Sequence, residues 1–257
     1  MEITDMMGNR VVLNGQPKRI VSLVPSQTEL LYDLGLDEEV VGITKFCVHP
    51  DQWFRSKKRV GGTKTVHIDI VKALQPDLVI ANKEENTKEQ IEELSGLFPV
   101  WVSNIQTVGD GLKMISELGA LVGKAEAAQS LVEEINSGFA HLTKAATLKR
   151  VAYFIWRNPW MSVGGDTFIS DMIKTIGWQN VLAHKVRYPE IALEELVDIA
   201  PELVLLSSEP YPFKEAHIAE IKAVLPNSEV LLVDGEMFSW YGSRMARAVS
   251  YFERLIA

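Results

Sequence analysis

The chain has 257 residues, of which 47% are hydrophobic and 23% are charged, proportions typical of a globular protein with a sizeable core. The net charge of −8, with no basic stripe along the chain, argues against a nucleic-acid partner. No apolar run approaches the roughly 20 residues that a membrane-spanning helix needs. Cys47 is the only cysteine, which excludes an internal disulfide.

The first 19 residues show neither the apolar segment nor the cleavage motif of a secretory signal peptide. Two interpretations remain open. Either the protein stays inside the cell, or its signal peptide is missing from this sequence.

In the first part of the chain, short apolar runs alternate with helical patterns. We expect strands at 10–13, 19–24, 39–43, 77–81 and 99–103. We expect helices beginning at Ser26, with Glu29 as its capping-box partner, at Ile68, at Thr87 and at Thr107. Residues 45–58 read as an irregular, aromatic segment.

Residues 124–149 form the longest helical pattern in the chain. The segment contains no proline, and Leu131, Ile135, Phe139 and Leu142 recur at steps of three and four, which places them on one helix face. About 25 residues at 1.5 Å each would reach roughly 37 Å, long for an ordinary crossover helix. The segment is either such a crossover or a rigid strut between two lobes.

The second part of the chain repeats the alternation of strands and helices. We expect strands at 150–156, 161–163, 202–206 and 229–233, and helices at 193–199, 215–225 and 240–256. A further helix is expected to open at Gly164–Thr167 and to end near Gly177. Continuous apolar strands that alternate with helices indicate parallel sheets covered on both faces.

The two parts also resemble each other in sequence. Residues 68–81 align without gaps with residues 193–206, so that Asp69 lies over Glu194, Pro76 over Pro201 and Asp77 over Glu202. A two-copy repeat around one long helix favours the strut interpretation. We therefore expect an α/β fold of two similar lobes with mainly parallel sheets: an N-terminal lobe at 1–123, a linking helix at 124–149 and a C-terminal lobe at 150–257.

Candidate ligand-binding residues follow from the rule that open parallel sheets bind ligands beyond the carboxyl ends of their strands. Those positions here are rich in aromatic and polar side chains, which suit a large, partly apolar ligand. The candidates are Phe46, His49, Trp53, Thr63, Asn82, Trp156, Trp160, Tyr188, Glu236, Trp240, Tyr241 and Arg244. Trp156, Trp160, Trp240 and Tyr241 look least like core residues, because they flank Arg157, Pro159 and Gly242.

Signals for catalysis are weak. The sequence has no HExxH, GxSxG, GxGxxG or P-loop motif, so we do not expect an enzyme, a catalytic residue or an intrinsic cofactor. Gly164–Thr167 could hold an anion at a helix N-terminus, although a turn with a cap is the commoner use of such a segment. Cys47 and His49 could offer two metal ligands, fewer than the usual three or four, so we expect no metal site.

Four segments together carry a resemblance to a known family. They are residues 19–31 (RIVSLVPSQTELL), residues 60–62 (VGG), the helix–Pro76–Asp77–Leu78–Val79 unit and residues 240–244 (WYGSR), and they resemble class III periplasmic substrate-binding proteins. The similarity covers nearly the whole chain and is greatest to the cobalamin-binding and iron-chelate-binding members. Thr63 and Asn82 depart from it, since they replace two stacking tryptophans of the cobalamin-binding members.

The resemblance implies a monomeric receptor that captures a metal chelate (a corrinoid, a ferric siderophore or haem) in an interlobe cleft and delivers it to an ABC importer. It implies that the receptor is located in the periplasm or at the cell surface. It also implies that Asp69 and Glu194 dock on arginines of the permease. Two other classes of function stay open: a cytosolic carrier or sensor of corrinoids or iron chelates, and an enzyme that acts on such a cofactor. A signal peptide at the native gene start, or turnover of a chelate, would separate them.

Overall fold

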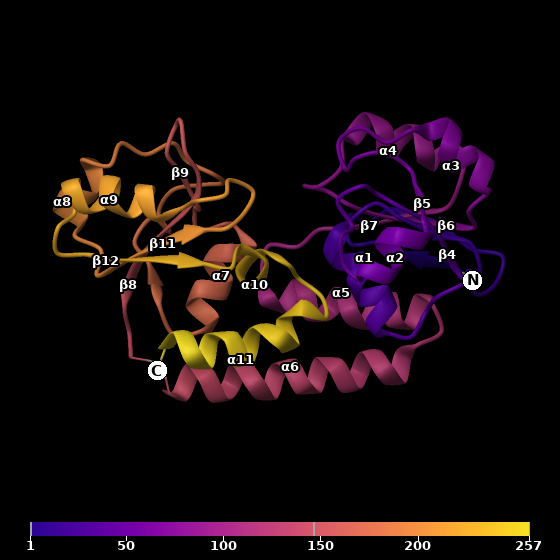
Figure 1. The fold of residues 1–257 in the computed structure, drawn as a ribbon. Coiled ribbons are helices and arrows are strands. Elements are labelled where there is room, and N and C mark those ends of the chain that lie inside the picture. Colours follow the sequence, from indigo (N-terminus) through magenta and orange to yellow (C-terminus); the bar gives the residue numbers. More distant parts are fainter. Residues whose placement is uncertain (1, 146, 257) are drawn as a thin grey trace. The chain divides into compact units, whose positions relative to one another are not determined.

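The structure, a computed structural model, describes residues 2–145 and 147–256. The chain divides into two compact units (Figure 1). Unit 1 comprises the residues up to Ile105, Gly109–Glu133 and Tyr241–Arg244. Unit 2 comprises Gln106–Val108, Glu134–Trp240 and the residues from Met245 onward.

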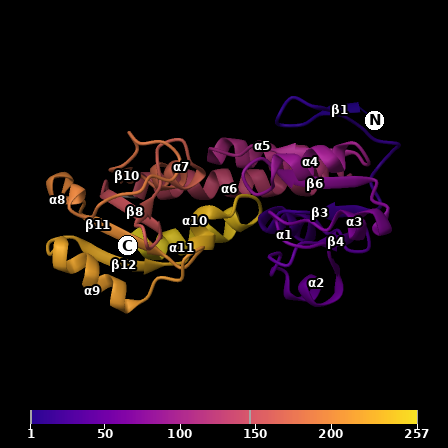
Figure 2. The same cartoon turned by 90° about the horizontal axis from the view of Figure 1, so that it is seen from above.

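Unit 1 is built on a parallel sheet of five strands in the order β5-β4-β3-β6-β7. Its strands are β3 (Ile20–Ser22), β4 (Val40–Ile43), β5 (Lys58–Arg59), β6 (Leu78–Asn82) and β7 (Val100–Ser103). Its helices are α1 (Pro25–Asp33), α2 (Asp51–Ser56), α3 (Ile68–Leu74), α4 (Lys88–Ser95) and most of α5 (Val108–Leu121). A hairpin of β1 (Glu2–Thr4) and β2 (Arg10–Val12) lies outside this sheet, and the amide of Met6 beside it donates to Val102 O at 3.1 Å (Figure 2).

Alternate residues of the unit 1 strands build the core on one face of the sheet. Val21, Val79 and Val102 are buried on this face, and α3 and α4 contribute Val71 and Leu94. The period of two along a strand explains why such continuous apolar runs can bury both faces of one sheet.

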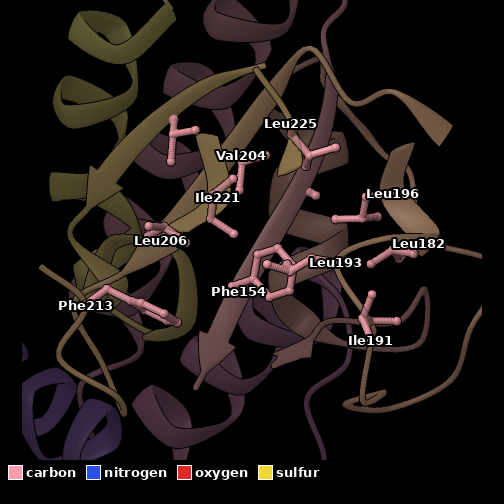
Figure 3. Packing of buried hydrophobic residues seen from close by; sticks show 12 residues of the cluster. Phe154, Leu182, Ile191, Leu193, Leu196, Val204, Leu206, Phe213, Ile221 and Leu225 are labelled. Carbon is pink, nitrogen blue, oxygen red and sulfur yellow. The ribbon is translucent and has the colours of Figure 1, made fainter. Parts of the chain in front are cut away.

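Unit 2 contains a second sheet, with the parallel order β10-β8-β11-β12 and β9 added antiparallel to β8. Its strands are β8 (Arg150–Trp156), β9 (Met161–Ser162), β10 (Gln179–Asn180), β11 (Leu203–Ser207) and β12 (Glu229–Val233). Its helices are α7 (Phe168–Thr175), α8 (Glu195–Ile199), α9 (Glu215–Val224), α10 (Gly235–Ser239) and nearly all of α11 (Arg244–Ile256). Phe154, Val204 and Leu206 from the sheet pack with Leu196 and Ile221 from α8 and α9 (Figure 3).

The two units share one topology. The strands β4-β3-β6-β7 of unit 1 correspond in order to β10-β8-β11-β12 of unit 2, and each set is parallel throughout. The prediction of two similar α/β halves is confirmed. The helices correspond as well: short α3 precedes β6 in unit 1, and short α8 precedes the equivalent strand β11 in unit 2.

The predicted long helix is present as α6 (Ala125–Ala145), unbroken over 21 residues. It is shorter than expected, since Thr147–Lys149 are not helical; Ala146 lies outside the described residues. Ile135, Phe139 and Leu142 are buried, as the helical spacing predicted, whereas Leu131 is only half-buried. Residues of α6 up to Glu133 belong to unit 1 and the following ones to unit 2. The domain boundaries at 123/124 and 149/150 stay predictions.

Three local expectations were wrong. The first concerns α1, which begins at Pro25 without a side-chain cap; Ser26 lies inside the helix and Glu29 pairs elsewhere, so there is no capping box. The second concerns residues 45–58, which include the helix α2. The third concerns the last helix, which begins at Arg244 rather than at Trp240.

None of the helices within the described part of the chain combines the length and the apolar character that a bilayer crossing requires.

Candidate functional site

The carboxyl ends of the unit 1 strands carry a buried polar cluster. The Asn82 side chain, 2% exposed at the end of β6, donates to Ser103 Oγ at 2.9 Å and accepts from the amides of Glu84 and Glu85. The Gln27 amide also donates to the Ser103 hydroxyl. Asn82 thus uses both ends of its amide within the protein, and its role in the structure is to shape this edge of the sheet.

Phe46 and His49 are the more accessible of the unit 1 candidates. Phe46 is 49% exposed, and its ring packs so closely over Gly62 that a Cβ there would lie 3.2 Å from Phe46 Cε2. The Lys45 ammonium lies 5.0 Å from the ring centroid. His49 is half-buried in the same loop, whereas Thr63 is buried. An exposed ring packed beside a glycine suits contact with an apolar ligand surface.

Trp53, another unit 1 candidate, is not exposed beside Phe46 and His49. It is fully buried on α2, in edge-to-face contact with Tyr32 at 5.3 Å, and its indole N–H donates to Asp37 Oδ1 at 2.8 Å. The Lys57 ammonium and this indole lower the pKa of the Asp37 carboxyl. The sequence suggested a ligand contact because the α2 helix, which turns the ring inward, was not expected.

Arg244 and Tyr241 are also buried, at 6% and 8% exposure. The Arg244 guanidinium donates to both carboxylate oxygens of Glu29, at 2.9 and 2.8 Å. A bidentate pair of this kind satisfies two charges that would otherwise be costly to bury. In the structure, Arg244 therefore fixes residues 241–244 to α1.

Unit 2 contains a continuous group of rings, which we call the aromatic surface: Trp156, Trp160, Tyr211, Phe213 and His217. Phe213 is buried in the core, Trp160, Tyr211 and His217 are half-buried, and Trp156 is exposed. Trp156, at the end of β8, is 39% exposed and meets Tyr211 edge to face at 5.7 Å. Trp160 and Phe213 stack at 5.6 Å with 10° between their planes. Tyr211 Oη and His217 Nε2 lie 3.1 Å apart. Trp156 is held by its neighbours yet remains accessible.

Arg157 supports the aromatic surface from outside. Its guanidinium lies 4.8 Å from the centroid of Trp160 and pairs with Glu220 at 2.7 Å. Tyr211, Phe213 and His217 are not among the twelve candidates named above. Tyr211 and Phe213 nevertheless lie beyond the carboxyl end of β11, the kind of position from which those candidates were drawn.

Next to the aromatic surface, three carboxylates line a cavity of about 660 Å³: Glu209, Asp234 and Glu236, together with Phe213 and Ser208. Glu209 Oε1 accepts from Ser239 Oγ at 2.8 Å and from Trp240 Nε1 at 3.0 Å. Burial raises the pKa of Glu209, and the neighbouring Glu236 and Asp234 raise it further, against the hydrogen bond from Ser239. Trp240 is buried, so its indole fixes Glu209 and is not an open ligand platform.

The glycine turn at Gly164–Gly165 uses its amides within the protein: Gly164 N donates to Arg187 O at 2.7 Å and Gly165 N donates to Lys185 O at 3.0 Å. A Cβ at Gly164 would lie 2.5 Å from Lys185 O, and one at Gly165 would lie 2.2 Å from Ala183 O. The Asp166 carboxylate accepts a hydrogen bond from the backbone amide of Arg187 at 2.5 Å. The segment serves as a turn and cap. Half-buried Tyr188 follows Arg187, whose guanidinium lies 5.4 Å from its ring.

Cys47 is fully buried, with the hydroxyl oxygens of Thr28 and Thr44 at 3.1 and 3.2 Å from its Sγ. Burial raises the pKa of its thiol. Within the described ranges, no group of three or more histidine, cysteine, aspartate or glutamate side chains is arranged to hold a metal ion.

Asp69 and Glu194, the predicted docking residues, are exposed at the starts of equivalent helices. The Asp69 side chain is 99% exposed in the first turn of α3, and its carboxylate lies 3.9 Å from the Lys72 ammonium. Glu194 is the N-cap residue of α8, and its side chain makes no capping hydrogen bond. Neither carboxylate is committed to the fold.

A larger cavity, of about 1060 Å³, lies elsewhere in unit 1, between the β1–β2 hairpin and α4. Its lining includes Val11, Ile91, Phe98 and Val100, together with Asn82. It does not include Phe46 or His49.

Comparison with known proteins identifies the family to which the chain belongs. The sequence profile of a family described as "Periplasmic binding protein" matches residues 20–227. The chain belongs to this family. It is 29% identical over 214 residues to an uncharacterized ABC transporter substrate-binding lipoprotein, YvrC, of Bacillus subtilis, a match that covers 79% of this chain and 68% of the relative.

Two further comparisons cover nearly all of this periplasmic binding protein. A vitamin B12-binding protein of Vibrio campbellii is 26% identical over 245 residues, with 92% of this chain and 88% of the relative covered. The crystal structure of the periplasmic vitamin B12 binding protein BtuF of Vibrio cholerae superimposes with a TM-score of 0.79 at 21% identity, covering 93% of this chain and 96% of that one. The structural likeness shows the shared fold.

Proposed function

We propose that the protein is a substrate-binding protein that captures a metal–organic chelate and delivers it to an ABC importer. The observation that carries the proposal is the match, along 92% of the chain, to a protein named for vitamin B12 binding. The proposed class of ligand comprises corrinoids, haem and ferric siderophores, with a corrinoid as the first candidate.

The aromatic surface of unit 2 supports this class of ligand. Corrinoids and porphyrins are large, flat and partly apolar, and an exposed indole offers a face of matching chemistry. The Trp156 ring is accessible, and its edge-to-face contact with Tyr211 already restricts its rotation. Binding would therefore cost little side-chain entropy. In this proposal the protein recognises the organic periphery of the chelate, with Trp156 as the main anchor. Tyr188 in unit 2, and Phe46 and His49 in unit 1, remain proposed ligand contacts.

The carboxylates beside the aromatic surface favour one kind of chelate over another. Glu209, Asp234 and Glu236 provide hydrogen-bond acceptors and negative charge at the 660 Å³ cavity. Amide groups, such as those around a corrin ring, can donate to such acceptors, whereas the carboxylates of haem would be repelled. Neutral or cationic chelates are therefore the preferred ligands.

Delivery is proposed to use Asp69 and Glu194. Both carboxylates are exposed and uncommitted, and they occupy equivalent positions in the two copies of the repeat. They can pair with basic residues of a permease at the cost of one exposed contact, the 3.9 Å pair of Asp69 with Lys72. A binding protein of this kind docks on its importer from outside the cytoplasmic membrane. We therefore propose a periplasmic or lipid-anchored location for the protein, as for its relatives.

Calorimetric titration tests the binding proposal. The panel comprises cyanocobalamin, cobinamide, haem and a ferric hydroxamate, and we expect micromolar or tighter binding of at least one, with quenching of tryptophan fluorescence. Trp156→Ala should weaken that binding by about 1–3 kcal/mol, because it removes a central aromatic anchor. Trp156→Phe, which keeps an aromatic face, is the matched control. Failure of the whole panel to bind would refute the proposal.

A further inference from the structure

The helices that carry the two docking carboxylates end in the same unusual way. The C-cap residue of α3 is Gln75, with φ 45° and ψ 60°, and that of α8 is Ala200, with φ 49° and ψ 66°. Both are left-handed conformations, which non-glycine residues adopt at a cost in free energy. The same strained turn, each time followed by a proline, occurs once in each unit.

An arginine from the start of the neighbouring strand holds each turn. Arg19 donates from Nε and Nη2 to Leu74 O, at 3.0 and 2.6 Å, and from Nε to Gln75 O at 3.2 Å. In unit 2, Arg150 Nη1 donates to Ala200 O at 3.2 Å, and its Nη2 donates to Ile199 O. Each guanidinium therefore binds the carbonyls that the end of a helix leaves unsatisfied.

An acidic residue fixes the backbone of each arginine in turn. The Asp77 carboxylate accepts from the amides of Lys18 and Arg19, both at 2.8 Å, and the amide of Asp77 donates to Arg19 O at 2.9 Å. The Glu202 carboxylate accepts from the amide of Arg150 at 3.0 Å, and the amide of Glu202 donates to Arg150 O at 2.9 Å. The two clamps share this reciprocal pattern at the backbone.

These short helices are held along one apolar face and, at their C-terminal ends, by the arginines. Neither α3, with seven residues, nor α8, with five, has a side-chain hydrogen bond at its N-cap. Each has one buried residue, at equivalent positions: Val71 and Leu196. Helices this short are not stable alone, so their direction depends on the contacts that hold them. Here these are an apolar face, in which half-buried Ile68, Ile70 and Leu74 accompany Val71 and half-buried Ile199 accompanies Leu196. Glu195 also pairs with Lys185 at the start of α8. At the C-terminal end of each helix, the contact is the arginine clamp.

We propose that Arg19 and Arg150 are positioning residues for docking: by clamping the C-terminal ends of α3 and α8, they aim Asp69 and Glu194 at the permease. The inference rests on the proposed function, because it concerns the same docking carboxylates. Neither arginine needs to touch the permease. The competing explanation is that the clamps only stabilise the strained turns.

A glycine rescue separates these explanations. Arg19→Gln should lower the Tm and weaken docking on the cognate permease–ATPase complex in lipid nanodiscs by about two- to fivefold, the loss expected for one exposed charge pair. In Arg19→Gln/Gln75→Gly, glycine adopts the turn without strain, so the Tm should recover. Docking should stay weak, because glycine does not fix the direction of the helix. Recovery of docking together with the Tm would overturn the proposal.

A double-mutant cycle provides the second readout. If Arg19 acts through Asp69, Arg19→Gln should weaken docking in the wild-type background and cause no further loss in an Asp69→Ala background. Equal losses in both backgrounds would contradict the proposal. Asp69→Ala alone tests the docking carboxylate itself, and cyanocobalamin binding, measured separately by calorimetry, reports on the receptor function. Arg150, Ala200 and Glu194 provide the same set of variants in unit 2.

Discussion

At the scale of single residues, burial decides which of the candidate side chains can meet a ligand. Arg244 and Trp240 have the chemistry of ligand contacts, yet both are buried against carboxylates of the protein, Glu29 and Glu209. The Arg244–Glu29 pair joins residues 215 positions apart, which no local pattern reveals. Trp156 keeps the exposure that a ligand contact needs.

Glu209 leads to a prediction about pH. Because burial raises its pKa, the folded protein binds this proton more tightly than the unfolded chain does. The contribution of Glu209 to the free energy of unfolding is therefore largest at low pH, and it is lost as the pH rises from the ordinary pKa of glutamate through the raised value. Glu209→Gln keeps the acceptor for Trp240 and removes the titration. Relative to wild type, its free energy of unfolding should increase across that range.

Urea unfolding of both proteins from pH 4 to pH 8 measures this difference. Glu93→Gln, at an exposed position of α4, is the control for the loss of a carboxylate. A constant difference between Glu209→Gln and wild type over the whole range would show that Glu209 titrates alike in the folded and unfolded states.

At the scale of helices and strands, the sequence predicted most elements, because apolar periodicity is a local property. The runs at β6 and β11 and the helical face of α6 were found in this way. The exceptions have physical causes. The final helix begins at Arg244 because Gly242 adopts φ 106°, a left-handed conformation outside the helical range. The helix α2 was missed because its only apolar residues, Trp53 and Phe54, are adjacent and therefore show no helical spacing.

The continuity of α6 gives a prediction at this scale. Gly138→Pro should destabilise the protein by about 3 kcal/mol, because proline removes a helical hydrogen bond and clashes with the preceding turn. Gly138→Ala is the matched control, since any Cβ at this position would lie 2.6 Å from Val249 Cγ2 on α11. The difference between the two variants in urea unfolding isolates the effect of proline. Equal stabilities would show that the helix is already interrupted there.

At the scale of the whole molecule, the repeat is the feature that the sequence predicted best and the ligand the one it predicted least. Pro76 and Pro201, each followed by an acid, align the two halves in the sequence, and the common strand order confirms the duplication. The identity of the chelate depends on side chains that come from separate loops and differ in burial, such as Trp156 and Trp53. Residue type alone could not separate them.

Chelate uptake tests the central claim most directly. In proteoliposomes that contain the cognate importer, wild-type protein loaded with radiolabelled cyanocobalamin should drive uptake. Asp69→Lys/Glu194→Lys should bind cyanocobalamin with unchanged affinity in calorimetry, because both positions are exposed. It should nevertheless abolish uptake, since like charges would meet at the permease. A double-lysine variant that folds, binds cyanocobalamin and still supports full uptake would contradict the account.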